Sequence, residues 1–158
     1  MRVGIAVDVH PFADGRRLVL GGVPFEGERG LAGHSDADVV AHASAEALLG
    51  AAGLGDLGAH FPDTDPQWRG ADSIALLAEV ARRLAEAGWR TGNVDCSVVL
   101  EAPRLAPHRA AMEARLSAAA GGPVSVKATR PEHLGALGRG EGVACLAVAL
   151  VLPADDRP

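Results

Sequence analysis

Aromatic residues and positive charge are both scarce in this chain. Aromatic residues make up 3% of its 158 residues, and its formal net charge is −5. A surface that binds nucleic acid needs a basic stripe and rings on which bases stack. The composition therefore argues against a nucleic-acid partner, although it leaves room for a small anionic substrate held by local positive charge.

Long apolar runs and paired cysteines are also missing. The longest apolar run, residues 143–152, is too short to cross a bilayer as a helix. The chain opens without the charged start and apolar core of a signal peptide, so we expect a soluble protein without a membrane partner. Cys96 and Cys145 lie far apart in apolar runs and form no zinc or redox motif. We interpret them as small core residues of a cytoplasmic protein.

What is present indicates one α+β domain over residues 1–152, followed by a polar tail over residues 153–158. Hydrophobic residues make up 48% of the chain, which is enough for a core. Strands are predicted over 2–10, 94–100, 124–128 and 143–152, with a hairpin over 18–20 and 23–25 around Gly21-Gly22. Helices are predicted over 36–49, 72–87 and 107–120. Residues 30–35, the segment through 61–66 and residues 130–142 are predicted to be loops.

This order of segments predicts a mostly four-stranded mixed sheet with helices on one face. The last strand is apolar on both alternations, which is typical of a strand buried on both faces. We therefore expect the face without helices to pack against other subunits.

The first chemical motif is Asp8-Val9-His10 on the first strand. Residues i and i+2 of a strand point to the same side. Asp8 and His10 are therefore expected to converge, while Val9 faces the core. A carboxylate and an imidazole on one side suit a divalent metal.

The second motif surrounds the start of the first predicted helix. His34 and Ser35 precede that helix, where free N–H groups and the helix dipole favour phosphate oxygens. Asp38, His42 and Glu46 are spaced by four and form one stripe. A histidine between two carboxylates suggests an imidazole that they orient for a metal. Asp8, His10 and His42 are three candidate ligands that leave one position open, as catalytic zinc requires.

Further motifs follow along the chain: Asp56-Leu57-Gly58, Phe61-Pro62-Asp63-Thr64-Asp65, Ala102-Pro103-Arg104, the Val-Lys-Ala-Thr run at 126–129 and the Gly-Arg-Gly-Glu-Gly run at 138–142. Together with the His34-to-His42 segment, they resemble the 2-C-methyl-D-erythritol 2,4-cyclodiphosphate synthase family of the non-mevalonate isoprenoid pathway. The resemblance extends over residues 2–152.

The resemblance implies a homotrimer with active sites between adjacent subunits, and it implies that Asp8, His10 and His42 bind zinc. It assigns catalytic positions to His34 and Arg130, and Glu132 matches a ligand for a second divalent cation, Mg²⁺ or Mn²⁺. The implied substrate contacts at the phosphates are Asp8, His10, His34 and Ser35, and those at the methylerythritol are Asp56, Leu57, Gly58, Phe61, Pro62, Asp63, Thr64 and Asp65. The implied contacts at the cytidine come from the neighbouring subunit and are Leu100, Ala102, Pro103, Arg104, Leu105 and Ala106. Thr129, Glu132 and Arg139 complete the implied contacts, and Arg139 points towards the trimer axis, where the family can hold an isoprenoid diphosphate.

The implied reaction converts 4-diphosphocytidyl-2-C-methyl-D-erythritol 2-phosphate into the cyclic diphosphate. The 2-phosphate attacks the β-phosphorus of the cytidine diphosphate arm, and cytidine monophosphate (CMP) leaves. Because the nucleophile is already an anion, no protein base is needed. The transition state requires positioning and charge neutralisation instead.

Two positions depart from the family pattern and leave alternatives open. Arg130 stands where the family has a second threonine, and Ala136 stands where a phenylalanine is common. A guanidinium can still neutralise phosphate charge. The alternatives are a non-catalytic zinc trimer that binds cytidine nucleotide or isoprenoid diphosphate, and a zinc-dependent phosphohydrolase.

Three other histidines, His60, His108 and His133, are interpreted as surface or capping residues rather than metal ligands. Trp68 and Trp89 are predicted to cover the core from loop edges.

Overall fold

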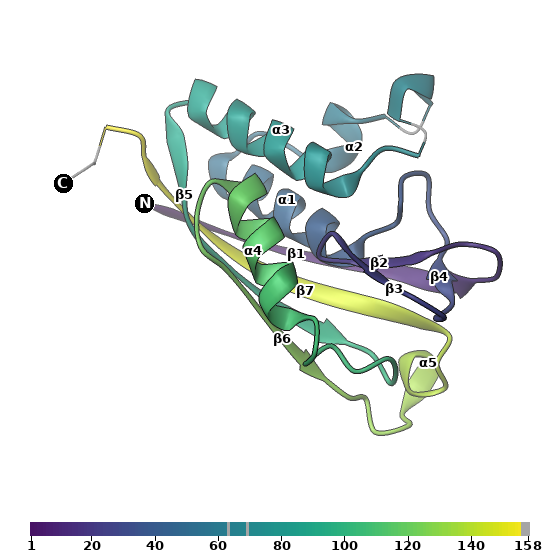
Figure 1. The fold of residues 1–158 in the computed structure, drawn as a ribbon. Coiled ribbons are helices and arrows are strands. Elements are labelled where there is room, and N and C mark those ends of the chain that lie inside the picture. The colour runs from purple at the N-terminus through teal and green to yellow at the C-terminus, as the bar shows by residue number, and fades with distance from the viewer. Residues whose placement is uncertain (63, 69, 156–158) are drawn as a thin grey trace.

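The computed structural model describes residues 1–62, 64–68 and 70–155 (Figure 1). Two sequence expectations therefore lie outside the described residues: Asp63 as a substrate contact, and residues 156–158 of the polar tail.

The sheet is mixed and has four long strands, as predicted. These are β1 (Arg2–Ala13), β5 (Trp89–Val99), β6 (Val124–Thr129) and β7 (Gly142–Pro153). The two-residue strand β4 (Gly30–Leu31), in a segment predicted to be a loop, adds a short edge, so the strand order is β4-β1-β7-β5-β6. Only β5 and β6 pair in parallel. The predicted hairpin forms separately from β2 (Leu18–Leu20) and β3 (Val23–Phe25).

Three long helices lie on one face of this sheet (Figure 1). They are α1 (Val39–Ala52), α3 (Ser73–Glu86) and α4 (Arg109–Ala120). Helix α1 packs on β1 and β7, α4 packs on β6, and α3 packs against both of these helices. No helix among the described ranges is long and apolar enough to cross a membrane.

Short helices interrupt two segments that the sequence predicted to be loops. Helix α2 (Leu57–His60) begins where Asp56 Oδ1 accepts the N–H of Ala59 at 2.8 Å. A 3₁₀ turn spans Pro66–Trp68, and its proline stands in first place, where no backbone N–H is needed. Helix α5 (Gly135–Gly138) lies between β6 and β7. The loop predictions therefore missed these short helical turns, of which α2 is capped by the side chain of Asp56 and α5 has no side-chain cap.

Close contact between β1 and α1 brings the candidate ligands together. A Cβ atom at Gly4 would lie 2.1 Å from the carbonyl oxygen of Ala47 and 2.5 Å from the nitrogen of Ala51. Only a residue without a side chain permits this approach. The alanine-rich face of α1 therefore lies directly on β1, and His42 reaches the side of the strand that carries Asp8 and His10.

The opposite face of the sheet is apolar and exposed in the single chain. Val3, Ile5, Val7 and Val9 of β1 are 55–70% exposed, and Leu146 and Val148 of β7 are 40% and 43% exposed. The prediction that Val9 faces the core was wrong, because the strand alternation that turns Asp8 and His10 towards α1 turns Val9 away. Similarly, β7 is covered on only one face by its own chain.

Candidate functional site

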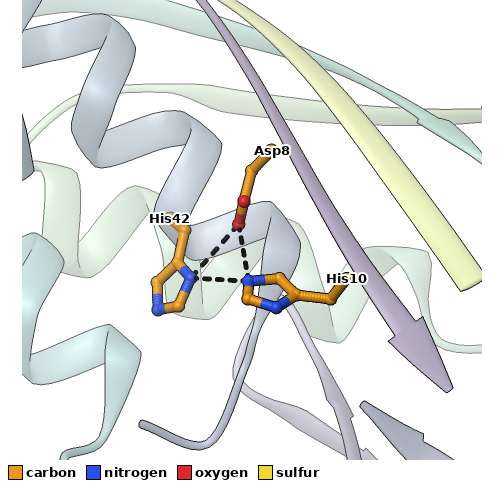
Figure 2. A group of neighbouring side chains, drawn as sticks. All are labelled: Asp8, His10 and His42. Atoms are coloured by element: carbon orange, nitrogen blue, oxygen red, sulfur yellow. Dashed lines mark hydrogen bonds and ion pairs between the residues drawn. The ribbon is translucent and has the colours of Figure 1, made fainter. Parts of the chain in front are cut away.

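Asp8, His10 and His42 form a triangle of potential ligand atoms between β1 and α1 (Figure 2). Asp8 Oδ2 lies 3.1 Å from His10 Nε2 and 3.2 Å from His42 Nδ1. The two imidazole nitrogens are 3.4 Å apart. The structure thus brings together the three side chains that the sequence offered as candidate ligands.

The spacing of these atoms fits one small metal ion. Donor atoms bound to a tetrahedral zinc ion at about 2.0–2.1 Å lie about 3.3 Å from one another. The three observed separations, 3.1, 3.2 and 3.4 Å, match one face of such a tetrahedron. The fourth corner of the tetrahedron is left for a substrate oxygen or water. Two imidazoles and one carboxylate also form a donor set that suits zinc better than magnesium.

A hydrogen bond from Nδ1 orients the ring of His10 so that Nε2 faces the other two side chains of the triangle. His10 Nδ1 lies 2.6 Å from the carbonyl oxygen of Ala32. Since a carbonyl only accepts, Nδ1 carries a proton, so a neutral His10 ring keeps its lone pair on Nε2. That lone pair faces Asp8 and His42, as metal binding requires.

The ring of His42 is fixed through its other nitrogen. His42 Nε2 lies 2.8 Å from Ser73 Oγ and 3.0 Å from Ser35 Oγ. The Ser73 hydroxyl donates a short hydrogen bond to Asp36, so its oxygen is available to accept the Nε2 proton of His42. His42 Nδ1 then has a free lone pair. The resulting chain of contacts runs from the metal position through imidazole and hydroxyl to a carboxylate.

This arrangement corrects the predicted role of the stripe formed by Asp38, His42 and Glu46. Asp38 does not contact His42 through its carboxylate. Asp38 Oδ1 accepts the N–H groups of Gly21 at 2.8 Å, Val40 at 3.1 Å and Ala41 at 3.2 Å, and Oδ2 accepts that of Gly22 at 2.6 Å. Burial raises the pKa of Asp38 to about 6, although these N–H groups oppose the rise.

Glu46 has a different partner as well. Its Oε2 accepts the N–H of Leu57 at 2.7 Å and so holds the start of α2. A spacing of four places side chains on one helical stripe, but it does not determine which of them meet. Asp38 turns to cap its own helix, and Glu46 turns to the next loop. Sequence reasoning missed the roles of Ser73 and Asp36, because Ser73 comes from a separate segment and Asp36 contacts His42 only through Ser73.

Asp8 and His10 shift each other's pKa within the triangle. Burial disfavours the ionised form of Asp8, but hydrogen bonds from His10 and His42 and the charges of both rings outweigh it and hold the pKa of Asp8 well below its usual value. The hydrogen bond to Asp8 raises the pKa of His10, against burial and the charge of Arg16. The site therefore stabilises positive charge between its three side chains.

His34 and Ser35 lie beside the triangle, but not for the predicted reason. Helix α1 begins at Val39, and Asp38 already caps its first N–H groups. Ser35 is 7% exposed and bonded to His42, whereas the side chain of His34 is exposed. Arg16 holds this segment by donating to the carbonyl oxygens of Gly33 at 2.8 Å and Ser35 at 2.5 Å.

Two cavities flank the imidazoles of His10 and His42. One, of about 270 Å³, is lined by both imidazoles and by Val7, Asp8, Glu46 and Leu57. The other, of about 180 Å³, is lined by the imidazoles and by His34, Ser35, Leu57, Phe61, Trp68 and Leu76. Leu57 and Phe61, two of the predicted substrate contacts, therefore line a cavity beside these imidazoles. Asp56, Gly58 and Thr64 are exposed, while Pro62 and Asp65 are half-buried.

The predicted cytidine contacts gather in a third cavity of about 200 Å³. It is lined by Leu100, Glu101, Pro103, Arg104, Leu105, Ala106, Ala128, Thr129 and Arg130. Ala102 lies apart from this group and lines a neighbouring cavity with Arg139. The cytidine cavity shares no lining residue with the two cavities at the triangle. Within one chain, the triangle and the cavity with the predicted cytidine contacts are therefore two separate parts of the predicted site.

Glu132 and Arg139 are not brought to the triangle. Glu132 is exposed and has a φ of 52°, and His133 follows with a φ of 62°. Among the described residues, Glu132 forms no cluster with two other potential metal ligands. Arg139 Nε lies 2.6 Å from Glu141 Oε1 in an exposed ion pair.

Fold and site together define a single-domain α+β protein with a candidate metal site formed by three side chains. Comparison with known proteins identifies the family: the YgbB family profile matches residues 1–152. The chain belongs to this family.

The relatives share most of this chain. A 2-C-methyl-D-erythritol 2,4-cyclodiphosphate synthase of Thiobacillus denitrificans is 54% identical, over 96% of each chain. A bifunctional enzyme IspD/IspF of Anaeromyxobacter sp. is 58% identical over 95% of this chain, which spans only 39% of that enzyme's length. A solved cyclodiphosphate synthase in a CDP-bound form is 36% identical, with a TM-score of 0.86 and coverage of 96% of this chain and 100% of the other.

Proposed function

We propose that this chain catalyses the reaction for which its relatives are named. It cyclises 4-diphosphocytidyl-2-C-methyl-D-erythritol 2-phosphate to 2-C-methyl-D-erythritol 2,4-cyclodiphosphate and releases CMP, in the non-mevalonate isoprenoid pathway. The observation that carries the proposal is the triangle of Asp8, His10 and His42, whose ligand atoms lie 3.1–3.4 Å apart beside a cavity lined by His34 and Ser35.

Zinc is the ion that this donor set fits, and when bound it supplies a Lewis acid for a phosphoryl oxygen. The protein's own groups hold the ligands in place: Ala32 fixes His10, and Ser73 fixes His42. His34 is exposed at the same cavity and can donate to a phosphate oxygen. No side chain needs to remove a proton, because the attacking phosphate is already ionised.

The active form is a homotrimer with each site shared between neighbours. Two observations support this arrangement. The cytidine cavity and the triangle share no lining residue within one chain, and the exposed apolar face of β1 and β7 needs cover. A trimer has three times the 16.1 kDa mass of one chain, which light scattering measures directly.

Thr129, Arg130 and Glu132 complete the proposed site next to the cytidine cavity. Thr129 and Arg130 line that cavity, which supports a role for the guanidinium of Arg130 in neutralising phosphate charge. Glu132 is proposed to hold a second divalent cation, Mg²⁺ or Mn²⁺, on the diphosphate. Two free buried cysteines, Cys96 and Cys145, are consistent with a cytoplasmic location.

The direct test is to incubate the purified protein with the substrate, zinc and magnesium, and to follow the phosphorus NMR spectrum. Formation of the cyclic diphosphate with one CMP per turnover is expected. Hydrolysis without ring formation would instead identify a phosphohydrolase. No turnover by a trimer that still binds zinc and cytidine nucleotide would contradict the proposal and favour a non-catalytic binding protein.

A further inference from the structure

We propose that His60 and Arg83 act together as positioning residues for the wall of the substrate cavity formed by Phe61. The sequence alone suggested a surface or capping role for His60. This inference rests on the proposed function for its kinetic test, but its geometry is independent of the metal.

His60 bridges the pocket loop and helix α3 through both of its ring nitrogens. Its Nε2 lies 2.7 Å from the carbonyl oxygen of Leu54, and therefore carries the proton. Its Nδ1 lies 2.5 Å from Arg83 Nη1. Because a guanidinium has no acceptor, Nδ1 must be the accepting atom. Both contacts together require a neutral imidazole in one tautomer.

Arg83 connects this histidine to Phe61. Its Nε donates to Glu79 Oε1 at 2.8 Å, which fixes the guanidinium on α3. Its Cζ lies 5.0 Å from the centre of the Phe61 ring, within the range of a cation–π contact. One planar group therefore holds His60 and Phe61, two consecutive residues of the loop, against a long helix.

Phe61 transmits this contact to the cavity. Its ring is 7% exposed and packs edge-on against Trp68, with ring centres 5.0 Å apart. Phe61 and Trp68 both line the cavity of about 180 Å³ that also contains His34, Ser35 and the two metal-site imidazoles. A shift of Phe61 would change the shape of this cavity without touching a metal ligand.

The loop needs such anchors because its own helix is too short to fix its position. Helix α2 has four residues, and an isolated turn of this length is not stable in water. Glu46 holds its first residue through the N–H of Leu57. The carbonyl oxygen of Leu54 and the guanidinium of Arg83 hold its last residue, His60, and so fix the position from which the chain continues to Phe61.

The kinetic test compares His60→Leu and Arg83→Met with Arg82→Met. Arg82 is the neighbour of Arg83, pairs with Glu79 and Glu86, and makes no hydrogen bond or ion pair with the described residues of the loop, which makes it a matched control. We call His60→Leu and Arg83→Met the clamp variants. We expect KM for the substrate to rise about tenfold in both, because each loses the hydrogen bond between His60 and the charged Arg83. The kcat and the zinc content should stay within about twofold of the parent values, a change of about 0.4 kcal/mol or less.

Two further variants separate positioning from general loss of stability. His60→Gln keeps an amide donor and an oxygen acceptor, and is expected to restore most of the affinity. The double variant His60→Leu/Arg83→Met should cost less than the sum of the two single variants, because both remove the contact between His60 and Arg83. An unchanged KM in the single variants, additive effects, or loss of zinc in both would overturn the proposal.

Fluorescence provides a readout that does not depend on turnover. In a Trp89→Phe background, Trp68 is the remaining tryptophan, and acrylamide quenching reports its exposure. Both clamp variants should increase quenching, whereas Arg82→Met should not. If the parent protein shows no turnover, the proposed function fails while this measurement still tests the clamp. Unchanged quenching in both clamp variants would contradict it.

Discussion

Ser73 Oγ lies 2.8 Å from His42 Nε2, although 31 residues separate the two in sequence. The same hydroxyl donates to Asp36, so a carboxylate acts on the metal-site imidazole through a serine. Ser73 is 1% exposed, which shields this contact from water. Such outer contacts commonly determine how strongly a metal site binds.

Replacing Ser73 with alanine should therefore weaken zinc binding by about tenfold while leaving the three ligands intact. Competition with a chromogenic chelator measures this change. Ser73→Thr keeps the hydroxyl and should stay near the parent affinity. His42→Ala should remove zinc and activity together. Equal affinity in Ser73→Ala and the parent would show that the hydroxyl does not orient His42.

Gly4 should be intolerant of a side chain. The Cβ of Gly4→Ala would lie 2.1 Å from the backbone oxygen of Ala47, and backbone cannot move aside cheaply. We expect the free energy of unfolding to fall by about 2–3 kcal/mol. Gly50→Ala is a suitable control, because a Cβ there meets no atom within 4 Å and alanine favours the helix. Urea denaturation should show opposite shifts of the midpoint for the two variants.

The Arg130→Thr variant tests whether the arginine that replaces the family's threonine affects catalysis. If arginine is a tolerated substitute for threonine, Arg130→Thr should leave kcat equal or higher, because positioning and metal charge dominate the barrier. Steady-state kinetics on the variant provide the measurement. A collapse of kcat, with KM and zinc content unchanged, would instead mean that the guanidinium has its own catalytic role.

Glu79 should make stability depend on acid pH. Hydrogen bonds from Arg82 and Arg83 lower the pKa of Glu79 from its ordinary 4.5 to about 2 in the folded protein. The stabilisation is therefore complete above about pH 4.5 and is lost as the pH falls towards about 2. Since the pair is largely exposed, the effect should be modest. Glu79→Gln should remove this part of the pH dependence, and the difference between the two unfolding curves isolates it.

Local sequence patterns determined the main helices and strands and the pairing of Asp8 with His10 in the candidate site. Alternation along β1 placed Asp8 and His10 on one side, and the periodicity of residues 72–87 predicted α3 to within one residue at each end. These results follow from short-range geometry, in which a period of two or 3.6 residues fixes the direction of each side chain.

Only the tertiary structure decided what each polar side chain of α1 contacts. A spacing of four suggested that Asp38 and Glu46 orient His42, whereas Asp38 binds the Gly21-Gly22 turn and Glu46 binds Leu57. The orienting groups, Ser73 and Asp36, come from separate segments that meet only when α3 packs against α1. Sequence spacing fixes directions within one element, but contacts between elements depend on how those elements pack.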